Sequence, residues 1–376
     1  MNKILTTGLM LFCTLANAQN NFKISGKLSG FQENALVKIE RQNIILDSCY
    51  LKNGRFQLNG SFEESPTPVH LTIHNGKDFI YTSLFIGNET ITINAKIEDF
   101  PYDIKAVGSE YNILNYENSQ QKKDLNIQRK KLINEMFVLR EQGKWNDSLQ
   151  NAFWSTKEPL GKVRLIDNQL KRLNDDFIDE NFNSYYGLYL MEIYKTEIPK
   201  SKLQNYIDKL NPELRNTAYA KSIESHLKYP DLKVGEKYYN FSALDKNGKK
   251  RMFSEYFSNK YVLLDFSTVY CGFCIQAIPD LEQIKKNQNE RLEIVTFYVD
   301  KSQKGYDGLT QKHNENWTIL WDKKGRLSDT YAKYKVFGTP TFYLFAPNGA
   351  LVQKFEGYSE DLSERIEKLI TQSDSN

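Results

Sequence analysis

Residues 261–274 read YVLLDFSTVYCGFC, and this stretch decides the fold of the C-terminal part of the chain. Its first half is an apolar run that predicts a buried strand, and residues 275–286 after it have a helical pattern. Cys271 and Cys274 therefore stand at a strand-to-helix junction, on one face of the first helical turn. Unpaired backbone N–H groups and the helix dipole favour a thiolate there. The spacing is typical of dithiol–disulfide exchange.

The two cysteines have different predicted roles. Cys271, the more N-terminal and more exposed, is the expected nucleophile, and Cys274 is the expected resolving thiol. Asp265 lies six residues before Cys271 inside the apolar strand, so we expect a buried carboxyl. Burial raises the pKa of a carboxyl, which then exchanges a proton with the inner thiol near neutral pH. The other interpretation, an Asp at the strand end that faces solvent, stays open.

Zinc sites also use two cysteines at this spacing, but they need four Cys or His ligands. Cys49 stands in a different predicted domain, and no second ligand pair at zinc-like spacing is present. The four histidines, His70, His74, His226 and His313, do not supply such a pair either. We therefore expect no metal site.

Two prolines complete the pattern. Pro279 lies five residues after Cys274, inside the predicted helix, where it is expected to kink the helix. Residues 338–340 read Gly-Thr-Pro and come directly before a predicted strand at 341–345. An X–Pro bond in this position is a candidate for the cis form.

In this order, the strand, the cysteine pair and the two prolines resemble the thioredoxin fold. More narrowly, they resemble the periplasmic TlpA/ResA-like thiol–disulfide oxidoreductases, from about residue 233 to residue 370. The resemblance implies that Thr339 and a cis Pro340 lie beside the cysteine pair. It implies that this edge binds substrate by strand-like pairing, with Tyr270 and Phe273 beside it.

The resemblance also predicts the partners. It implies a reductase of disulfide-containing exported proteins that receives electrons from a membrane thiol donor. No bound cofactor is expected, because the dithiol is itself the redox centre.

The chain departs from that family at Tyr270, where Trp is usual, and at Phe273, where Pro is usual. Thr268 and Cys271 also fit the Thr-x-x-Cys pattern of peroxiredoxins, although the Pro three residues before that Thr is missing. Two alternatives therefore stay open. One is a thioredoxin-fold peroxidase, and the other is a partner-binding module with little redox activity.

The rest of the chain predicts two further domains before residues 229–376. Residues 19–108 show short alternating strands separated by Gly and Asn turns, which predicts a β-sandwich-like domain. This segment resembles a small β-domain of unknown function that often precedes such thioredoxin modules. Residues 109–228 are charged and have helical periodicity, which predicts an α-helical region. Cys49 lies in a strand-like run and is expected to be a small buried side chain.

The N-terminus predicts export. Residues 1–18 contain Lys3, an apolar run and a small-residue cleavage site at 16–18, as in a secretory signal peptide. We therefore expect a soluble protein of the periplasm. The 376-residue chain has 50 Lys+Arg and 47 Asp+Glu, a net charge of +3, which gives no reason to expect binding to nucleic acid.

Overall fold

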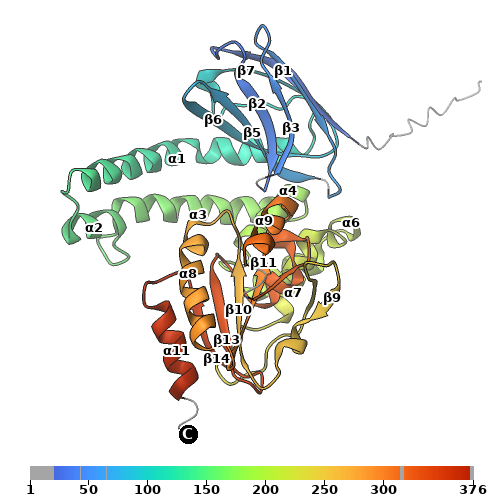
Figure 1. Cartoon of the computed structure of the whole chain (residues 1–376). Coiled ribbons are helices and arrows are strands. Elements are labelled where there is room, and N and C mark those ends of the chain that lie inside the picture. Colours follow the sequence, from blue (N-terminus) through green and yellow to red (C-terminus); the bar gives the residue numbers. More distant parts are fainter. Residues whose placement is uncertain (1–20, 43, 65, 314–316, 373–376) are drawn as a thin grey trace, which may run out of the picture.

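The computed structural model describes residues 21–42, 44–64, 66–313 and 317–372. The predicted signal peptide at residues 1–18 lies outside these ranges. Three parts follow one another along the chain: a β-domain, a helical region and a C-terminal α/β domain (Figure 1). The predicted fold class is confirmed. No helix in the described ranges has the length and apolar character needed to span a membrane.

The β-domain is a sandwich of two sheets around one core. One sheet has the order β4-β1-β7, and the other has the order β3-β2-β5-β6. The strands are β1 (Phe22–Ser29), β2 (Leu36–Arg41), β3 (Ile44–Tyr50), β4 (Arg55–Gly60), β5 (Thr67–Asn75), β6 (Asp78–Ile86) and β7 (Thr90–Lys96). Buried and exposed residues alternate along β4 and β7, so each strand turns its apolar side chains toward the opposite sheet.

Cys49 corrects one prediction. It lies on β3, which is the edge strand of the four-stranded sheet. Its side chain packs against the core of the sandwich but is only partly buried. The expectation of a small buried side chain was wrong.

The helical region packs on the β-domain. Its helices are α1 (Asn112–Glu141), α2 (Asp147–Trp154), α3 (Lys162–Asn181), α4 (Tyr185–Tyr194), α5 (Lys200–Lys209), α6 (Pro212–Arg215) and α7 (Ala218–Lys228). The helix α1 runs beneath the β-domain, with α3 on its other side (Figure 1). Phe85 of β6 belongs to the core of the helical region, where it lies among Tyr186 and Leu188.

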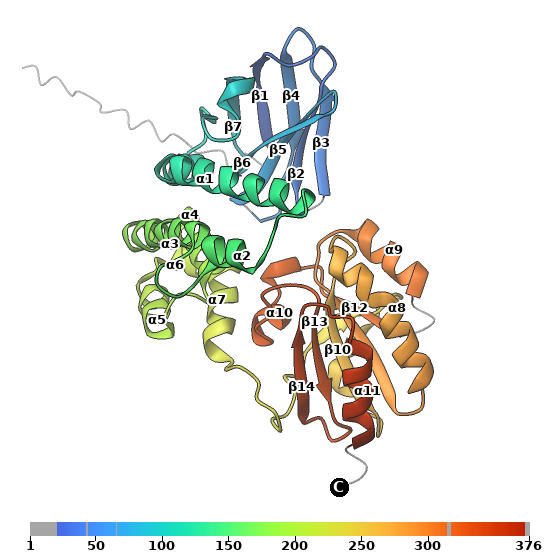
Figure 2. The ribbon, with the colours of Figure 1, turned by 90° about the vertical axis from the view of Figure 1, so that its left-hand side faces the viewer.

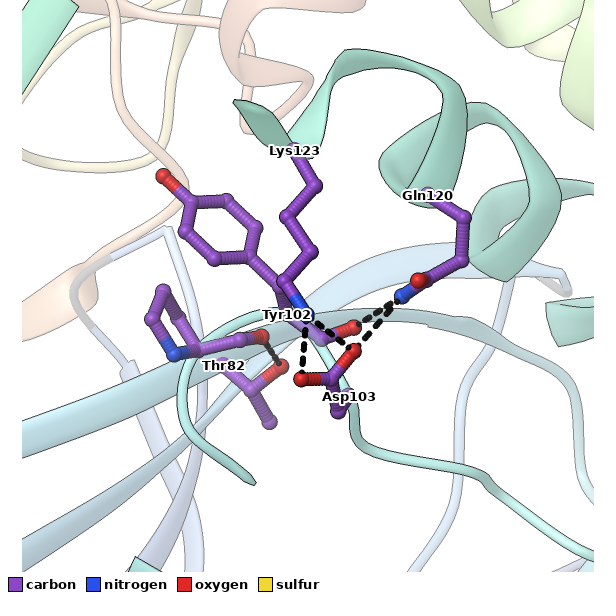
Figure 3. Close-up of polar contacts among 6 residues, drawn as sticks. Thr82, Tyr102, Asp103, Gln120 and Lys123 are labelled. Atoms are coloured by element: carbon purple, nitrogen blue, oxygen red, sulfur yellow. Dashed lines mark hydrogen bonds and ion pairs between the residues drawn. The ribbon is translucent and has the colours of Figure 1, made fainter. Parts of the chain in front are cut away.

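Polar contacts fix α1 to the loop after β7. Asp103 accepts hydrogen bonds from Lys123 at 2.6 Å and from Gln120 at 3.2 Å (Figure 3). Gln120 also donates to the Tyr102 carbonyl at 2.8 Å. In the same place, Thr82 of β6 donates to the carbonyl of Pro101 at 2.7 Å. These contacts orient the long helix on the sandwich.

The C-terminal domain has a mixed seven-stranded sheet in the order β14-β13-β10-β11-β12-β8-β9. Its strands are β8 (Ser242–Leu244), β9 (Lys250–Met252), β10 (Tyr261–Ser267), β11 (Leu292–Tyr298), β12 (Thr318–Trp321), β13 (Thr341–Phe345) and β14 (Leu351–Glu356). All seven residues of β10 are buried, because it is a central strand, parallel to β11 and antiparallel to β13.

Helices cover both faces of this sheet. The helices are α8 (Gly272–Asn287), α9 (Gln303–His313), α10 (Asp329–Lys333) and α11 (Leu362–Gln372). Side chains of α8, α9 and α11 share one core with the first face, and those of α10 share a second core with the other face. Figure 2 shows α8 and α11 side by side and α10 on the side of α7.

The three parts meet at one junction. Ser225 of α7 donates to Asp329 of α10 at 3.0 Å, and Leu327 of the α/β domain packs against the core of the helical region. A cavity of about 400 Å³ lies there, with Arg41, Tyr189 and Arg326 among its lining residues. The α/β domain is therefore in contact with both preceding parts.

Candidate active site

The cysteine pair lies where the sequence places it, at the junction of β10 and α8. Cys271 is the N-cap residue of α8, with extended backbone dihedral angles, and Cys274 lies in the first turn. Cys271 is partly exposed and Cys274 is buried. Both are free thiols, so the structure represents the reduced dithiol. The outer thiol is accessible and the inner one is protected, as nucleophilic attack followed by resolution requires.

The two thiols have opposite pKa shifts. Partial burial raises the pKa of the Cys271 thiol, but hydrogen bonds from Cys274 and from the backbone N–H of Phe273 outweigh burial and hold the pKa below its ordinary value. Burial raises the pKa of Cys274 to about 12, and hydrogen bonds with Thr339 and Ser267 offset only part of this shift. Cys271 is therefore the thiol that ionises first.

The loop before β13 lies against the outer thiol. The Cys271 thiol donates a hydrogen bond to the Thr339 carbonyl oxygen at 3.1 Å. The peptide bond between Thr339 and Pro340 is cis, as the sequence predicts. Residues 339 and 340 are thus brought together with the cysteine pair from a position 68 residues later in the chain.

Asp265 is a buried acid on β10, and its carboxylate Oδ2 accepts a hydrogen bond from Thr296 of β11 at 2.9 Å. Its Oδ1 has no hydrogen-bond partner in the described ranges. Leu263, two residues earlier, packs in the core under α8, so strand alternation places Asp265 on the α8 face of the sheet. Burial, opposed in part by the Thr296 hydrogen bond, raises the pKa of Asp265 to about 7.

Exposed apolar residues stand close in sequence to the cysteine pair and to Thr339. Phe273 is 60% exposed and Tyr270 is 44% exposed. Two further exposed apolar residues, Ile275 and Phe337, lie close in sequence to Cys274 and Thr339. Neither residue was predicted from the sequence, although the position of Phe337 two residues before Thr339 was a usable signal. We call these four residues the apolar rim.

The hydroxyl of Thr268, the threonine of the Thr-x-x-Cys pattern, has partners in the neighbouring loop and backbone. The hydroxyl donates a hydrogen bond to the carboxylate of Asp300, in the segment after β11, and accepts one from the backbone N–H of Tyr270 at 3.2 Å. The Tyr270 hydroxyl pairs with Ser302 at 2.8 Å. Asp300 and Ser302 were not anticipated, because nothing in the local sequence marks them.

Comparison with known families identifies the α/β domain. Residues 234–354 match the model of the AhpC/TSA family. The C-terminal domain is therefore similar to the thioredoxin-like domains of that family. Residues 22–115 match a second model, described as a domain of unknown function (DUF4369), so the thioredoxin-like domain follows an additional N-terminal domain.

Similar proteins include the thioredoxin-like protein YneN of Bacillus subtilis. It is 28% identical over 123 residues, which are 32% of this chain and 69% of that protein. Among solved structures, a putative thiol:disulfide interchange protein DsbE from Chlorobium tepidum is 25% identical. The match covers 38% of this chain and 99% of that one, with a TM-score of 0.35.

A second similar structure is the thioredoxin domain of a thiol-disulfide oxidoreductase from Bacteroides vulgatus. It is 23% identical and covers 37% of this chain and 99% of that one, with a TM-score of 0.34. The family match at residues 234–354 includes the cysteine pair, and both the family match and the YneN relative are of thioredoxin-like proteins. The thioredoxin-fold oxidoreductase character of this domain is thereby confirmed.

Proposed function

We propose that this protein is an exported thiol–disulfide oxidoreductase that reduces disulfide bonds of envelope proteins through Cys271 and Cys274. The observation that carries the proposal is the asymmetry of the pair. Cys271 is accessible, has a lowered pKa and lies 3.1 Å from the Thr339 carbonyl, whereas Cys274 is buried with a pKa of about 12. This arrangement suits attack by one thiolate and resolution by the other.

The reaction proceeds in two exchanges. The Cys271 thiolate attacks one sulfur of the substrate disulfide, so a mixed disulfide forms and the second substrate sulfur leaves as a thiolate that takes a proton. Cys274 then loses its proton, attacks the Cys271 sulfur and releases the first substrate sulfur. The substrate gains two electrons and two protons, and the Cys271–Cys274 pair becomes a disulfide. Asp265, on the α8 face of the sheet, accepts the Cys274 proton.

Substrate docking uses the edge beside the reactive thiol. An extended peptide pairs with the backbone of Thr339 next to cis Pro340, and the apolar rim contacts its side chains. A second dithiol must return the pair to the reduced state. We propose a membrane thiol donor for this step and the periplasm as the location, both supported by the predicted signal peptide at residues 1–18.

The test is the reduction potential of the Cys271–Cys274 pair in the full chain, measured by equilibration with dithiothreitol or glutathione buffers. We expect a reversible two-electron couple near that of thioredoxin, about −270 mV. A value near about −120 mV would reverse the direction to disulfide formation. Absence of a couple would refute the redox function.

A second candidate, a partner-binding module, is supported by the exposure of Phe273 and Phe337. Replacing Cys271→Ser separates the two functions. A reductase loses reduction of insulin disulfides completely, while a binding module retains its partner. Peroxidase activity is less supported, because the Thr268 hydroxyl is bound to Asp300. Consumption of hydrogen peroxide by the purified protein would support a peroxidase function instead.

A further inference from the structure

Residues 299–302, the segment between β11 and α9, form hydrogen bonds with residues 267–270, which come directly before Cys271. The backbone N–H of Val299 donates to the Ser267 carbonyl at 3.1 Å. Asp300 accepts the hydrogen bond from Thr268, and Ser302 pairs with the Tyr270 hydroxyl. The approach of the chain to the reactive thiol is therefore defined by this segment.

The same segment is itself fixed by Lys301 to the β-domain. Lys301 Nζ lies 2.5 Å from Glu64 Oε2, and Arg41 of β2 lies 3.0 Å from the same oxygen. The Lys301 and Arg41 side chains are only 17% and 12% exposed. Burial opposes ionisation of Glu64, but Lys301 and Arg41 outweigh it and hold the pKa of that carboxyl below its ordinary value. The contact joins residues 237 positions apart.

Lys301 is packed beside Gly325 and near Gln42 of the β-domain. A Cβ at Gly325 would lie 3.1 Å from Lys301 Cγ and 3.2 Å from Gln42 Oε1, so the lysine is closely packed between the two domains. The indole N–H of Trp321 donates to the Asp300 carbonyl at 2.5 Å, and the N–H of Gly305 donates to Ser302 Oγ at 3.1 Å. Asp300 and Ser302 are the chain neighbours of Lys301, so the Glu64 contact lies next to the two residues that bind Thr268 and Tyr270.

We propose that Glu64 of the β-domain is a positioning residue for Cys271, and that it acts through Lys301 and residues 299–302. This inference rests on the proposed function, because it concerns the reactivity of the same thiol. It assigns a role in redox chemistry to a domain that carries none of the reacting groups. Residues 64 and 301 link the sandwich to Thr268 and Tyr270, and these two residues precede the cysteine.

The helical region makes a comparable contact with the segment before Thr339. Lys335 is buried, and its ammonium group donates a hydrogen bond to the carbonyl of His226 in the last turn of α7. Carbonyl groups at a helix C-terminus carry partial negative charge and favour a cation. Lys335 lies four residues before Thr339, whose carbonyl accepts the Cys271 hydrogen bond. Both segments that frame the thiol are thus held by the preceding domains.

The test compares Glu64→Gln and Lys301→Met with Glu63→Gln in the full chain. Glu63 is the adjacent exposed acid and serves as the matched control. The measurement is the rate of Cys271 alkylation by iodoacetamide as a function of pH, at a temperature where every variant is folded. We expect Glu64→Gln and Lys301→Met each to slow alkylation at pH 7 by about two- to fivefold, the range that a partly exposed ion pair supports.

Two features separate positioning from a simple charge effect. Removal of the Glu64 charge alone would favour the thiolate and speed alkylation, whereas removal of the Lys301 charge would slow it. Positioning predicts that both variants are slower and that the double variant is no slower than either single one. A Glu64→Gln protein that reacts at the wild-type rate or faster, or a Glu63→Gln protein that is equally slow, would overturn the inference.

The reduction potential of the wild-type pair separates a failure of the proposed function from a failure of the Glu64 role alone. If the wild-type chain has no reversible couple, the proposed function fails. If the couple is present and the Glu64→Gln alkylation profile matches that of wild type, only the positioning role of Glu64 fails.

Discussion

The carboxyl group of Asp265 makes the stability of the folded protein depend on pH. An unfolded Asp has a pKa of about 3.9, and burial raises that of Asp265 to about 7. Between these values the folded state binds more protons than the unfolded state, so the free energy of unfolding falls as pH rises through this window. Three pKa units correspond to about 4 kcal/mol of the free energy of unfolding. The protein has lost this contribution once the pH is well above 7.

The variant Asp265→Asn should remove this dependence. Asn keeps an oxygen that accepts the Thr296 hydrogen bond but carries no titrating proton. Urea unfolding between pH 4 and pH 8 measures the effect. We expect a flatter profile in the variant, with the difference from wild type concentrated between about pH 4 and 7. Parallel profiles in the two proteins would mean that Asp265 ionises at its ordinary pKa.

At this scale the sequence predicts the reacting groups but not their partners. Cys271, Cys274, Asp265 and Pro340 follow from local patterns, namely a strand before a CxxC helix and a proline before a strand. The contact of Asp265 with Thr296 and that of Thr268 with Asp300 depend on strand pairing. Strand pairing joins residues that are distant in the chain. The local sequence around a single polar side chain does not indicate which distant residue it will contact.

Helix α9 depends on a glycine where it packs against the residues before Cys271. A Cβ at Gly305 would lie 3.0 Å from Val269 Cγ2 and 3.1 Å from Tyr270 Cε2, and it would press against the hydroxyl of the buried Tyr298. The variant Gly305→Ala should therefore lower the free energy of unfolding by about 1 to 3 kcal/mol, as overpacking does. Urea denaturation measures this change.

Gly308 is the matched control in the same helix. It is exposed, and a Cβ there would meet no atom within 4 Å. The variant Gly308→Ala should stabilise the protein by about 0.5 to 1 kcal/mol, because alanine is the better helix former. Equal effects of the two substitutions would show that α9 does not pack as closely as the structure describes.

These two glycines also explain why α9 was not predicted. Glycine weakens a helical pattern, and the residues around it are mostly polar. The strands and helices that carry clear apolar periodicity, such as β10 and α8, were predicted close to their observed positions. The five-residue helix α10 is too short to produce a periodic signal. Element prediction therefore succeeded where burial repeats along the chain.

At the scale of the whole molecule, the sequence predicts three parts but not how they dock. The contacts between them are isolated pairs such as Lys301 with Glu64 and Ser225 with Asp329. Neither pair belongs to a motif, and each joins residues more than a hundred positions apart. The domain arrangement is set by such pairs together with a few shared apolar side chains, so it emerges only in the folded structure.

Phe85 is the shared apolar side chain between the β-domain and the helical region. It is 1% exposed, and its ring lies 5.1 Å from that of Tyr189 and 5.3 Å from that of Tyr186. We expect Phe85→Ala to lower the free energy of unfolding by about 3 to 5 kcal/mol, through lost burial and a new cavity. Phe79 lies on the same strand but is 57% exposed, so Phe79→Ala is the control and should cost about 1 kcal/mol or less.

Hydrogen exchange followed by mass spectrometry shows where the Phe85→Ala effect falls. If the two parts unfold as one cooperative unit, the slow amides of β5 and those of α4 gain exchange rate together, because the lost contact belongs to both. If only the α4 amides accelerate, the β-domain is stable by itself and the helical region depends on it. In that case Glu64 would remain anchored in a folded sandwich even when the helices open, and its control of Lys301 would be independent of the helical region.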